Sequence, residues 1–369
     1  MKIIHLTVVR HLPGGIKKQL YCERDASKSL SGADWTTMVW QDEEGDGVLV
    51  NQIPFFFRHI FLRNIFAWFL ILKLSRRCDY LLVRHIPFDP LSFLFSMFVS
   101  NRVTVHHTKE IEEMRIVGEG WKGVCASALE SVAGKFLLRR NVGILAVTDE
   151  IGQYERARAK NLPEPGVYAN GIDVESVDIL DDARQEGCFN VAFICTSFSS
   201  WHGLEKLIET ILSDQSAVVS SRVRIHLIGE LSAHQSERIK ASRVLSEIFV
   251  CHGLLAVEGY RKVMSICDVG LGSLALELKG LSEASTLKVR EMLAMGLPVV
   301  SGHKDSSIPD GFSYYRIYPD GLLDFSEIIG LFGGGAYSRE EVRSASLPFI
   351  RKVDQMQSVV SYLACIKSE

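Results

Sequence analysis

The feature that most constrains the fold of this chain is the alternation of short, β-rich apolar runs with helical segments. Strands that are buried on both faces read as continuous apolar runs, and their alternation with helices is typical of parallel sheets. We therefore predict an α/β protein with two doubly wound parallel sheets. The predicted strands are residues 3–9, 35–40, 80–84, 103–106 and 143–148 in the first half, and 190–195, 223–228, 248–251, 269–271 and 297–301 in the second half.

The length of 369 residues accommodates two domains that each bury their own core. Between the two sets of runs, VYANGIDVESV (167–177) carries an Asn-Gly turn, and we place the interdomain linker there. We expect an N-terminal domain over 1–170, a C-terminal domain over 171–345 and a C-terminal helix over 346–369. Ligands bind at the carboxyl ends of strands in open α/β sheets, so two such domains that face each other are expected to form one cleft.

The net charge of -3 argues against a dedicated nucleic-acid-binding protein, but it conceals an asymmetry. Residues 1–170 contain 22 Lys and Arg against 18 Asp and Glu, whereas the remainder contains 19 against 26. An anionic surface, including an anionic lipid membrane, is therefore more plausibly met by the N-terminal half.

The eight cysteines form no CxxC pair and no metal-ligand spacing. We interpret them as buried thiols in a reducing cytoplasm. The apolar run of the N-terminus, MKIIHLTVVR, is too short for a signal peptide and is predicted to be the first strand.

The most apolar segment is PFFFRHIFLRNIFAWFLILKLSRR (54–77). Its longest stretch without a charge covers the nine residues 64–72, far fewer than the ~20 that a membrane-spanning helix needs. It is predicted either to lie in the membrane interface or to be a core helix with arginines that reach the surface. Its interfacial residues would be Phe55, Phe56, Phe57, Phe61, Phe66, Trp68 and Phe69, with Arg58, Arg63, Lys73, Arg76 and Arg77 toward lipid phosphates. The next segment, IPFDPLSFLFSMFVSN (86–101), is predicted to contain a buried helix.

The stretch EASTLKVREMLAMGLPVV (283–300) predicts a short helix that leads into a buried strand. Ser285 and Thr286 are good N-cap residues, Gly296 can take the left-handed position after the helix, and Pro298 prevents its continuation.

Charged residues surround the predicted start of this helix. Glu283 precedes it, Lys288 lies one turn in, and Glu291 lies about two turns in. A helix N-terminus attracts anions through its free N–H groups, and a carboxylate near such a site usually accepts hydrogen bonds from sugar hydroxyls. The stretch therefore indicates a nucleotide-diphosphate site, although an ordinary strand–helix unit with solvated charges explains it equally well.

Several motifs occur in a characteristic order, and together they resemble the GT-B glycosyltransferases, closest to the retaining family 4 group. The resemblance spans about 290 residues, and a helical tail commonly crosses back to the first domain in this fold. Its motifs are HLPGGIKKQ (11–19), YANGID (168–173), VAFICTSFSSWHGLEKLIE (191–209), RIHLIGE (224–230), CDVGLGSLALELKG (267–280) and the Glu, seven residues, Glu signature of Glu283 and Glu291.

The resemblance implies transfer of a sugar from a nucleotide diphosphate donor to an acceptor hydroxyl, with retention at the anomeric carbon and usually without a metal or cofactor. It places Glu291 on the ribose hydroxyls and Glu283 on the hydroxyls of the donor sugar. The amides of Ser285, Thr286 and Leu287, together with Lys288, would stabilise the leaving diphosphate. Gly14 and Gly15 would let the opposing backbone approach the donor closely.

One departure concerns the loop CTSFSSWHG (195–203), where the family often has an Arg and a Lys on the diphosphate. Thr196, Ser197 and His202 donate hydrogen bonds there but supply no permanent charge. Either Lys288 carries the diphosphate contact, with help from Lys279 or Arg290, or donor binding is weak.

The stretch VTVHHTKEIEEMR (103–115) follows a predicted strand, which places His106 and His107 at the cleft. The family has a histidine near the reacting carbon at a similar place, and the spacing leaves open which of the two matches it. Glu110, Glu112 and Glu113 either include an acceptor-side base or form a solvated helix face.

The function predicted from this resemblance is a hexosyl-transferring enzyme of cell-surface polysaccharide synthesis, such as that of lipopolysaccharide, O-antigen or capsule. Its expected partners are a nucleotide diphosphate sugar and a lipid-linked or oligosaccharide acceptor, with peripheral contact to an anionic membrane and no nucleic acid. The alternatives are a nucleotide-sugar 2-epimerase, which acts on the donor alone, and a non-catalytic subunit of a polysaccharide assembly. A dinucleotide-dependent oxidoreductase is disfavoured because no GxGxxG follows the first strand.

Overall fold

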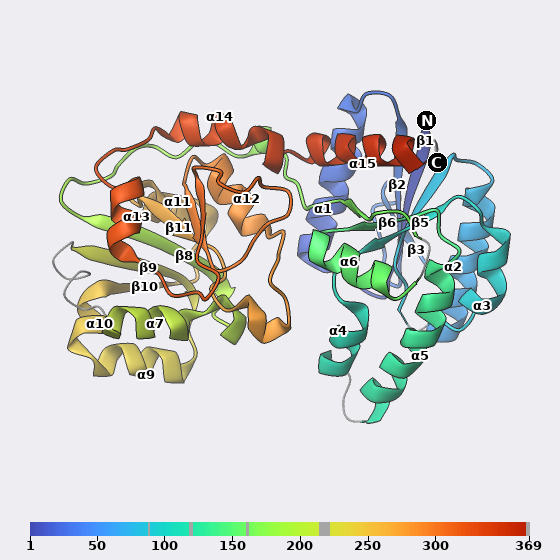
Figure 1. Ribbon diagram of the computed structural model, residues 1–369, viewed down its shortest axis with the longest axis horizontal. Helices are drawn as coiled ribbons and strands as arrows, with labels where there is room; N and C mark the ends of the chain where they lie inside the picture. Colours follow the sequence, from blue (N-terminus) through green and yellow to red (C-terminus); the bar gives the residue numbers. More distant parts are fainter. Residues whose placement is uncertain (88, 118–120, 160–161, 214–221, 367–369) are drawn as a thin grey trace. The chain divides into compact units, whose positions relative to one another are not determined.

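The chain folds into two compact units. The computed structural model describes residues 1–87, 89–117, 121–159, 162–213 and 222–366 (Figure 1). Unit 1 consists of Met1–Gly171 together with Arg351–Glu369, and unit 2 consists of Ile172–Ile350. Each unit contains a parallel sheet with helices on both faces (Figure 1), in agreement with the predicted α/β class.

Unit 1 is built on a sheet whose described strands are all parallel, in the order β3-β2-β1-β4-β5-β6-β7. The strands are β1 (Lys2–Val8), β2 (Asp34–Gln41), β3 (Val50–Gln52), β4 (Tyr80–Arg84), β5 (Arg102–His106), β6 (Gly143–Ala146) and β7 (Gly166–Val167). The helices are α1 (Gly14–Ala26), α2 (Ile60–Ser75), α3 (Ser92–Phe95), α4 (Glu110–Val117), α5 (Trp121–Leu138), α6 (Asp149–Ala157) and α15 (Lys352–Ile366).

The two faces of this sheet belong to different apolar layers. Leu81 and Val83 of β4 share a core with α2, whereas Tyr80 and Leu82 share a core with α15. Because side chains alternate between the faces of a strand, a strand that is covered on both sides needs apolar residues at every position. This explains the continuous apolar runs of the sequence.

Unit 2 has a second parallel sheet, whose described strands follow the order β10-β9-β8-β11-β12-β13. The strands are β8 (Phe189–Ser197), β9 (Val223–Glu230), β10 (Phe249–Gly253), β11 (Val269–Leu271), β12 (Val299–Ser301) and β13 (Tyr315–Ile317). The helices are α7 (Leu204–Ser213), α9 (Ala233–Ala241), α10 (Arg243–Ile248), α11 (Val257–Ser265), α12 (Leu287–Ala294), α13 (Phe325–Phe332) and α14 (Arg339–Ile350). One continuous apolar core joins this sheet to its helices.

The predicted strands all occur, with ends shifted by one or two residues, but β3, β7 and β13 were not predicted. These three strands have two or three residues, and each pairs with a single neighbour. Strands this short are held by the sheet beside them rather than by an apolar run of their own, so the sequence pattern alone does not reveal them.

Helix α12 has the predicted start and stop signals. Thr286 is its N-cap, and Gly296, the residue after the C-cap Met295, takes a φ of 82°. A Cβ atom at Gly296 would lie 2.4 Å from the Arg339 carbonyl oxygen, so both the conformation and the close contact require glycine there. Because the helix begins at Leu287, Glu291 is its fifth residue and lies just over one turn in, rather than the predicted two turns.

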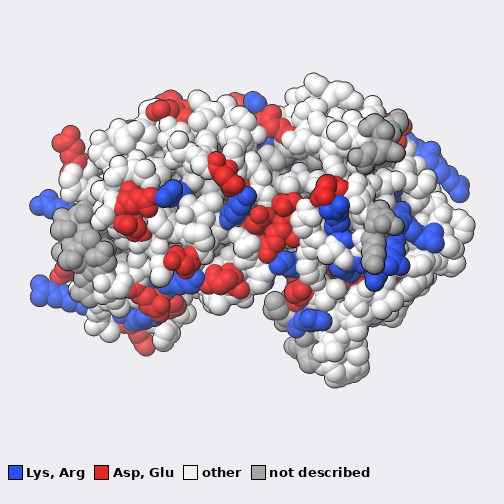
Figure 2. All heavy atoms as spheres, in the orientation of Figure 1, with Lys and Arg blue, Asp and Glu red and all other residues white. Residues whose placement is uncertain are grey.

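Helix α2 has one face in the core and one face outside. Within the helix, Phe66 and Trp68 are buried, whereas Phe61 and Phe69 are exposed, Phe69 by 60%; Phe55, shortly before the helix, is also exposed. Phe66 and Trp68 therefore do not belong to an interfacial surface, which corrects the predicted set. Figure 2 shows Lys and Arg side chains between broad uncharged areas on unit 1. None of the described helices combines the length and apolar character that crossing a bilayer requires.

The helix predicted to be buried within 86–101 is instead largely exposed. Its small residues Ser92 and Ser96 face inward, whereas Phe93, Leu94, Met97 and Phe98 are exposed, Phe98 by 65%. The reason is local. Asp89 accepts hydrogen bonds from Trp68 Nε1 at 2.6 Å and from the Leu91 amide, and this contact turns the serine face of the segment inward.

The C-terminal region consists of two helices in different units. Helix α14 contributes Val342 and Ile350 to the core of unit 2. Helix α15 contributes Val359 and Leu363 to the core of unit 1, and the Tyr80 hydroxyl donates to the Leu363 carbonyl at 2.9 Å. Residues 367–369 of the predicted C-terminal helix lie outside the described part of the chain.

The prediction that the cysteines are buried is correct for only some of them. Cys195 and Cys267 are buried, whereas Cys125, Cys251 and Cys365 are exposed, and all eight are free thiols. Cys251 is exposed because it lies on β10, the edge strand of its sheet.

Candidate functional site

Unit 2 contains a cavity of about 290 Å³ at the carboxyl end of β8, beside α12. Such a position, at the carboxyl edge of a parallel sheet, is where α/β proteins bind their ligands. The cavity is lined by Ile194, Cys195, Thr196, His202, Tyr260, Met264, Lys288, Glu291, Met292 and Met295.

Lys288 brings a positive charge to this cavity. Its ammonium group donates to Cys195 Sγ at 3.6 Å and lies 5.3 Å from the centre of the Phe193 ring. Burial lowers the pKa of Lys288. Among the described residues that line the cavity it is the only Lys or Arg, which makes it the principal cation for an anionic ligand.

His202 presents a hydrogen-bond donor to the same cavity. Its Nδ1 accepts from the Ser199 amide at 3.1 Å, as part of a capping box around the short helix 200–202. Burial lowers the pKa of His202 to about 4, with a further contribution from the nearby charge of Lys288. The ring is therefore neutral at pH 7, and because Nδ1 accepts, we assign its hydrogen to Nε2.

The N-terminus of α12 adds backbone donors. Because the helix begins at Leu287, with Thr286 as its N-cap, the amides of Leu287, Lys288 and Val289 have no partner within the helix. Thr286 caps the helix without a side-chain hydrogen bond, and its buried Oγ1 is unpaired among the described atoms. Ser285 is buried and lies outside the helix.

The two signature carboxylates have different surroundings. Glu291 lies three residues after Lys288 on α12, on the same helix face, and lines the cavity. Glu283 lies in the preceding loop, pairs with Lys304 through a β-bridge and accepts from the Ser306 hydroxyl at 2.5 Å. Glu283 is not among the lining residues.

The two other basic residues expected to help at the diphosphate have other partners. Arg290 is fully buried and forms an ion pair with Asp305 at 2.6 Å, with a second contact to Ser307, so it does not serve a ligand. Lys279 lies 3.9 Å above the Trp201 ring and does not line the cavity. Arg290 instead holds α12 against the loop 302–312 that carries Ser306.

Four predicted donor-site residues thus come together in the cavity, namely Thr196, His202, Lys288 and Glu291. Ser197 is exposed beyond them at the end of β8. The lining residues that sequence reasoning missed are mostly apolar, such as Tyr260 and Met264 of α11. They give no chemical signal in the sequence, and only the packing of α11 beside β8 brings them there.

Unit 1 contains a separate cavity of about 320 Å³ at the carboxyl ends of β1, β4 and β5. It is lined by Val8, Val9, Arg10, Arg63, Asn64, Ala67, Arg84, His85, Ile86, Pro87, Val105, His107, Thr108, Glu110 and Glu113. Arg10, Arg84 and His85 were not predicted as site residues. Arg63, which was expected to face lipid phosphates, instead lines this cavity with its side chain only 15% exposed. Arg84 is the last residue of the predicted strand 80–84, and this position at a strand's carboxyl end is the sequence signal that could have identified it as a site residue.

His106 is the last residue of β5, and His107 is the first residue after the strand. His107 lines the cavity of unit 1, and burial holds its pKa well below the usual value. His106 is fully buried, and its Nε2 is hydrogen-bonded to Thr104 Oγ1 at 3.0 Å. Burial lowers the pKa of His106 to about 3. Of the two, His107 is the one that a ligand in this cavity can reach.

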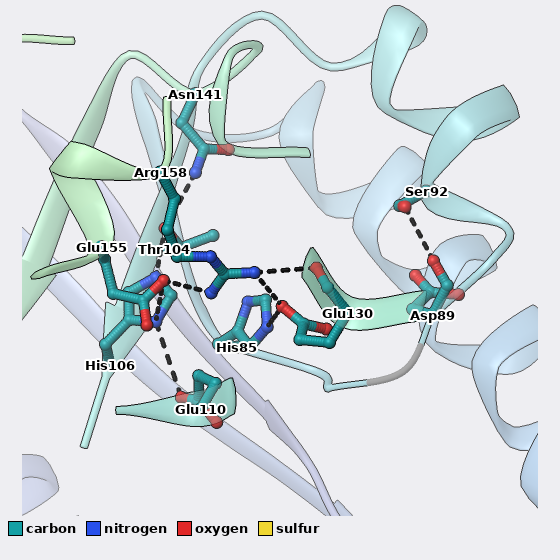
Figure 3. A network of polar contacts seen from close by, with 10 residues as sticks. All are labelled: His85, Asp89, Ser92, Thr104, His106, Glu110, Glu130, Asn141, Glu155 and Arg158. Atoms are coloured by element: carbon teal, nitrogen blue, oxygen red, sulfur yellow. Dashed lines mark hydrogen bonds and ion pairs between the residues drawn. The ribbon is translucent and has the colours of Figure 1, made fainter. Parts of the chain in front are cut away.

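His106 belongs to a buried polar network (Figure 3), of which His85 and Glu110 also line the cavity. Glu130 lies between His85, at 3.0 Å, and Arg158, at 2.7 Å, and Arg158 also pairs with Glu155 (Figure 3). The Glu130 carboxylate raises the pKa of His85 to about 9 against the opposing effect of burial, so His85 is charged at pH 7. The network therefore places an imidazolium in the wall of the cavity.

Glu110 connects this network to the cavity. It is 7% exposed, lines the cavity and lies 3.5 Å from His106 Nδ1. Burial raises the pKa of Glu110. Glu112 is not a lining residue, whereas Glu113 lines the cavity from an exposed position.

Gly14 and Gly15 are the first residues of α1, directly after its N-cap Pro13. A Cβ atom at either glycine would meet no atom of the described residues within 4 Å. Contacts within the chain therefore do not require glycine at these positions.

Comparisons with known proteins give structural similarity at low sequence identity. No protein-family model matches the chain, and no curated protein matches its sequence. Anabaena HepE in complex with UDP is 14% identical, with a TM-score of 0.61 over 99% of this chain and 100% of that chain. Sucrose-phosphate synthase from Thermosynechococcus elongatus is 12% identical, with a TM-score of 0.60 over 100% of both chains.

An alpha-glucosyltransferase solved with UDP-glucose and DNA containing an abasic site is also similar, at 14% identity and a TM-score of 0.57 over 99% of both chains. These matches extend over essentially the whole chain. Together with the two parallel sheets, they establish that the chain has the GT-B fold, with two Rossmann-like units.

Proposed function

We propose that this protein is a retaining glycosyltransferase that moves a hexosyl group from a nucleotide diphosphate donor to an acceptor hydroxyl. The observation that carries the proposal is the cavity of unit 2, where Lys288, His202 and Glu291 meet at the start of α12. A cation, a neutral imidazole donor and free helix amides suit a diphosphate, and a carboxylate one turn into the helix suits ribose hydroxyls. HepE and the alpha-glucosyltransferase, which share the fold, were solved with UDP-glucose.

In the proposed reaction, negative charge develops on the diphosphate as the glycosidic bond breaks. Lys288 and the amides of Leu287 and Val289 are in place before this charge forms, so they stabilise the transition state more than the ground state. Glu283, held by Ser306, is proposed to accept hydrogen bonds from the donor sugar. His107 is proposed to contact the sugar near the reacting carbon, and Gly14 and Gly15 to leave space for it.

Retention is proposed to occur without a glycosylated enzyme. A double displacement needs two carboxyl groups about 5 Å apart across the scissile bond. Glu291 lies on α12 beside Lys288, the proposed diphosphate contact, which suits a ribose role rather than attack on the anomeric carbon. The leaving phosphate is therefore proposed to take the acceptor proton on the same face of the sugar.

The proposal is tested by thermal unfolding in the presence of a panel of nucleotide sugars and nucleoside diphosphates. A ligand at 100 times its Kd stabilises the native state by about 2.7 kcal/mol. One nucleoside diphosphate and its sugar conjugate are expected to raise the Tm, and NMR of the product is expected to show a retained anomeric configuration. Donor turnover without an acceptor would instead indicate a 2-epimerase, and stabilisation without any turnover would indicate a non-catalytic subunit.

We further propose peripheral binding to an anionic membrane, consistent with a role in cell-surface polysaccharide synthesis. The surface consists of exposed aromatic and aliphatic side chains of residues 55–69 and 93–98, flanked by exposed basic residues. Such a combination suits the interfacial region of a bilayer, where apolar groups insert and cations meet lipid phosphates. The basic residues are Lys73, Arg76 and Arg77.

Exchange of Arg76 and Arg77 for Gln is expected to weaken binding to vesicles that contain anionic lipid by about 1 kcal/mol per charge. Exchange of Phe55 and Phe56 for Ser is expected to weaken binding to neutral and anionic vesicles alike. Co-sedimentation measures both. The matched control is exchange of the exposed Lys240 and Arg243 of unit 2 for Gln. Equal binding by wild type and all variants would contradict a membrane role for this surface.

A further inference from the structure

Three arginines from different elements converge on the cavity of unit 1. Arg10 follows β1, Arg63 lies on α2, and Arg84 is the last residue of β4. The proposed transfer of a neutral sugar to a hydroxyl gives none of them a role.

Arg84 is the most informative of the three. It is half-buried in the cavity wall, and its side chain forms no hydrogen bond or ion pair with any described residue. Burial lowers the pKa of Arg84, and the negative charges of Glu110 and Glu113 only partly offset that effect. A guanidinium group that is removed from water without a partner is unfavourable, and an anion that enters the cavity would remove this penalty.

Two of the other cations around the cavity, Arg63 and His85, are paired with carboxylates, which leaves Arg10 beside Arg84 for an anion. Arg10 is exposed, and its side chain also forms no hydrogen bond or ion pair with a described residue, whereas the charge of His85 is paired with Glu130 at 3.0 Å. Arg63 lies 3.7 Å from Asp42, whose carboxylate offsets the charge of the guanidinium group. The charge of the exposed Glu113 opposes an anion. Burial raises the pKa of Glu110, so its negative charge is lost more readily.

Helix α2 connects this cavity to an apolar surface. Its residues Arg63 and Asn64 line the cavity, while Phe61, only two residues from Arg63, is exposed by 52%. Phe55 and Phe56, shortly before the helix, are exposed by 75% and 81%. An anion in the cavity and an apolar chain attached to it would therefore both find suitable surfaces at the same end of α2.

We infer that the cavity of unit 1 binds a phosphate or diphosphate group of the acceptor substrate, with Arg84 and Arg10 as its principal ligands. The anion site itself is independent of the proposed function; only the assignment of the phosphate to the acceptor substrate rests on it. Two planar guanidinium forks can each bind two oxygens, which suits the several oxygens of a phosphate. The phosphate belongs either to a lipid-linked acceptor or to a water-soluble sugar phosphate.

The test is calorimetric titration of the full-length protein with inorganic diphosphate and with geranyl diphosphate, with sulfate as a second anion. The background is Lys288→Met, which removes the cation of the unit 2 cavity. Arg84→Gln is expected to weaken diphosphate binding at least tenfold, because one bidentate charged contact is lost. The control Arg139→Gln, at an exposed arginine of the same unit, is expected to change nothing.

The two sources of the phosphate are distinguished by the apolar chain. Tighter binding of geranyl diphosphate than of inorganic diphosphate, reversed by Phe61→Ser, indicates a lipid-linked acceptor, and equal binding indicates a soluble phosphate ester. If Arg84→Gln does not fold, Arg84→Lys and Arg10→Gln replace it, each with a smaller expected loss.

The inference is overturned if Arg84→Gln binds diphosphate as tightly as its parent, or if sulfate binds equally well. It is also overturned if the Lys288→Met protein binds no inorganic diphosphate while the wild-type protein binds a nucleoside diphosphate. Conversely, diphosphate binding that depends on Arg84, in a protein that no nucleoside diphosphate stabilises, would contradict the proposed function and leave the anion site standing.

Discussion

Replacement of Lys288 by Met is expected to lower kcat by about 10²–10³-fold, the loss typical for one preorganised donor to a developing negative charge. Lys288 is the only Lys or Arg among the described residues that line the unit 2 cavity, and the loop 195–203 supplies none. Methionine has a similar length, and removal of a largely buried charge leaves folding stability unchanged or higher. The expected combination is therefore severe loss of turnover with an unchanged or raised Tm.

The matched variant is Lys279→Met, which removes a lysine that stacks on Trp201 outside the cavity. It is expected to retain nearly all of the wild-type turnover. Steady-state kinetics with a saturating donor measures both variants. Equal losses in the two would show that the charge on the diphosphate is shared and that Lys288 has no special role.

Replacement of Glu291 by Gln is expected to weaken binding of the nucleoside diphosphate by about 10- to 100-fold. The reason is the loss of charge-assisted hydrogen bonds to the ribose hydroxyls, which contribute about 1.5–3 kcal/mol each. The carboxylate lines the cavity, and the exchange keeps its size, so stability is expected to change little. Calorimetric titration measures the affinity.

Glu209→Gln provides the control, because Glu209 is an exposed glutamate of α7 outside the cavity. A 2′,3′-dideoxynucleoside diphosphate adds a second comparison. This ligand is expected to bind wild type and Glu291→Gln with similar affinity, since it lacks the ribose hydroxyls that Glu291 is proposed to contact. Wild-type affinity of Glu291→Gln for the ordinary nucleotide would remove the ribose assignment.

Sequence reasoning recovered those parts of the fold that depend on local signals. The strands buried on both faces were predicted because their runs are mostly apolar. The boundaries of α12 followed from Thr286 and Gly296, whose roles are local. Short edge strands such as β13 were missed, because their pairing partners, not their own residues, determine them.

The candidate sites were predictable to a lesser degree. Lys288 and Glu291 share a cavity because they are three residues apart on one helix, which spacing alone implies. The choice between His106 and His107 depended on where β5 ends and which way its last side chain points, which the sequence leaves open. The partner of Asp89 is likewise set by tertiary contacts, so the exposure of Phe93 and Phe98 was not predictable.

The central claim is that the cavity of unit 2 binds the diphosphate of a nucleotide donor against the N-terminus of α12. Hydrogen–deuterium exchange with and without the best stabilising nucleoside diphosphate tests it most directly, because it reports on individual backbone segments. The account predicts slower exchange in peptides that cover 195–203 and 285–292, and no protection around Arg84 in unit 1. Protection confined to unit 1, or tight nucleotide binding that leaves 285–292 unprotected, would contradict it.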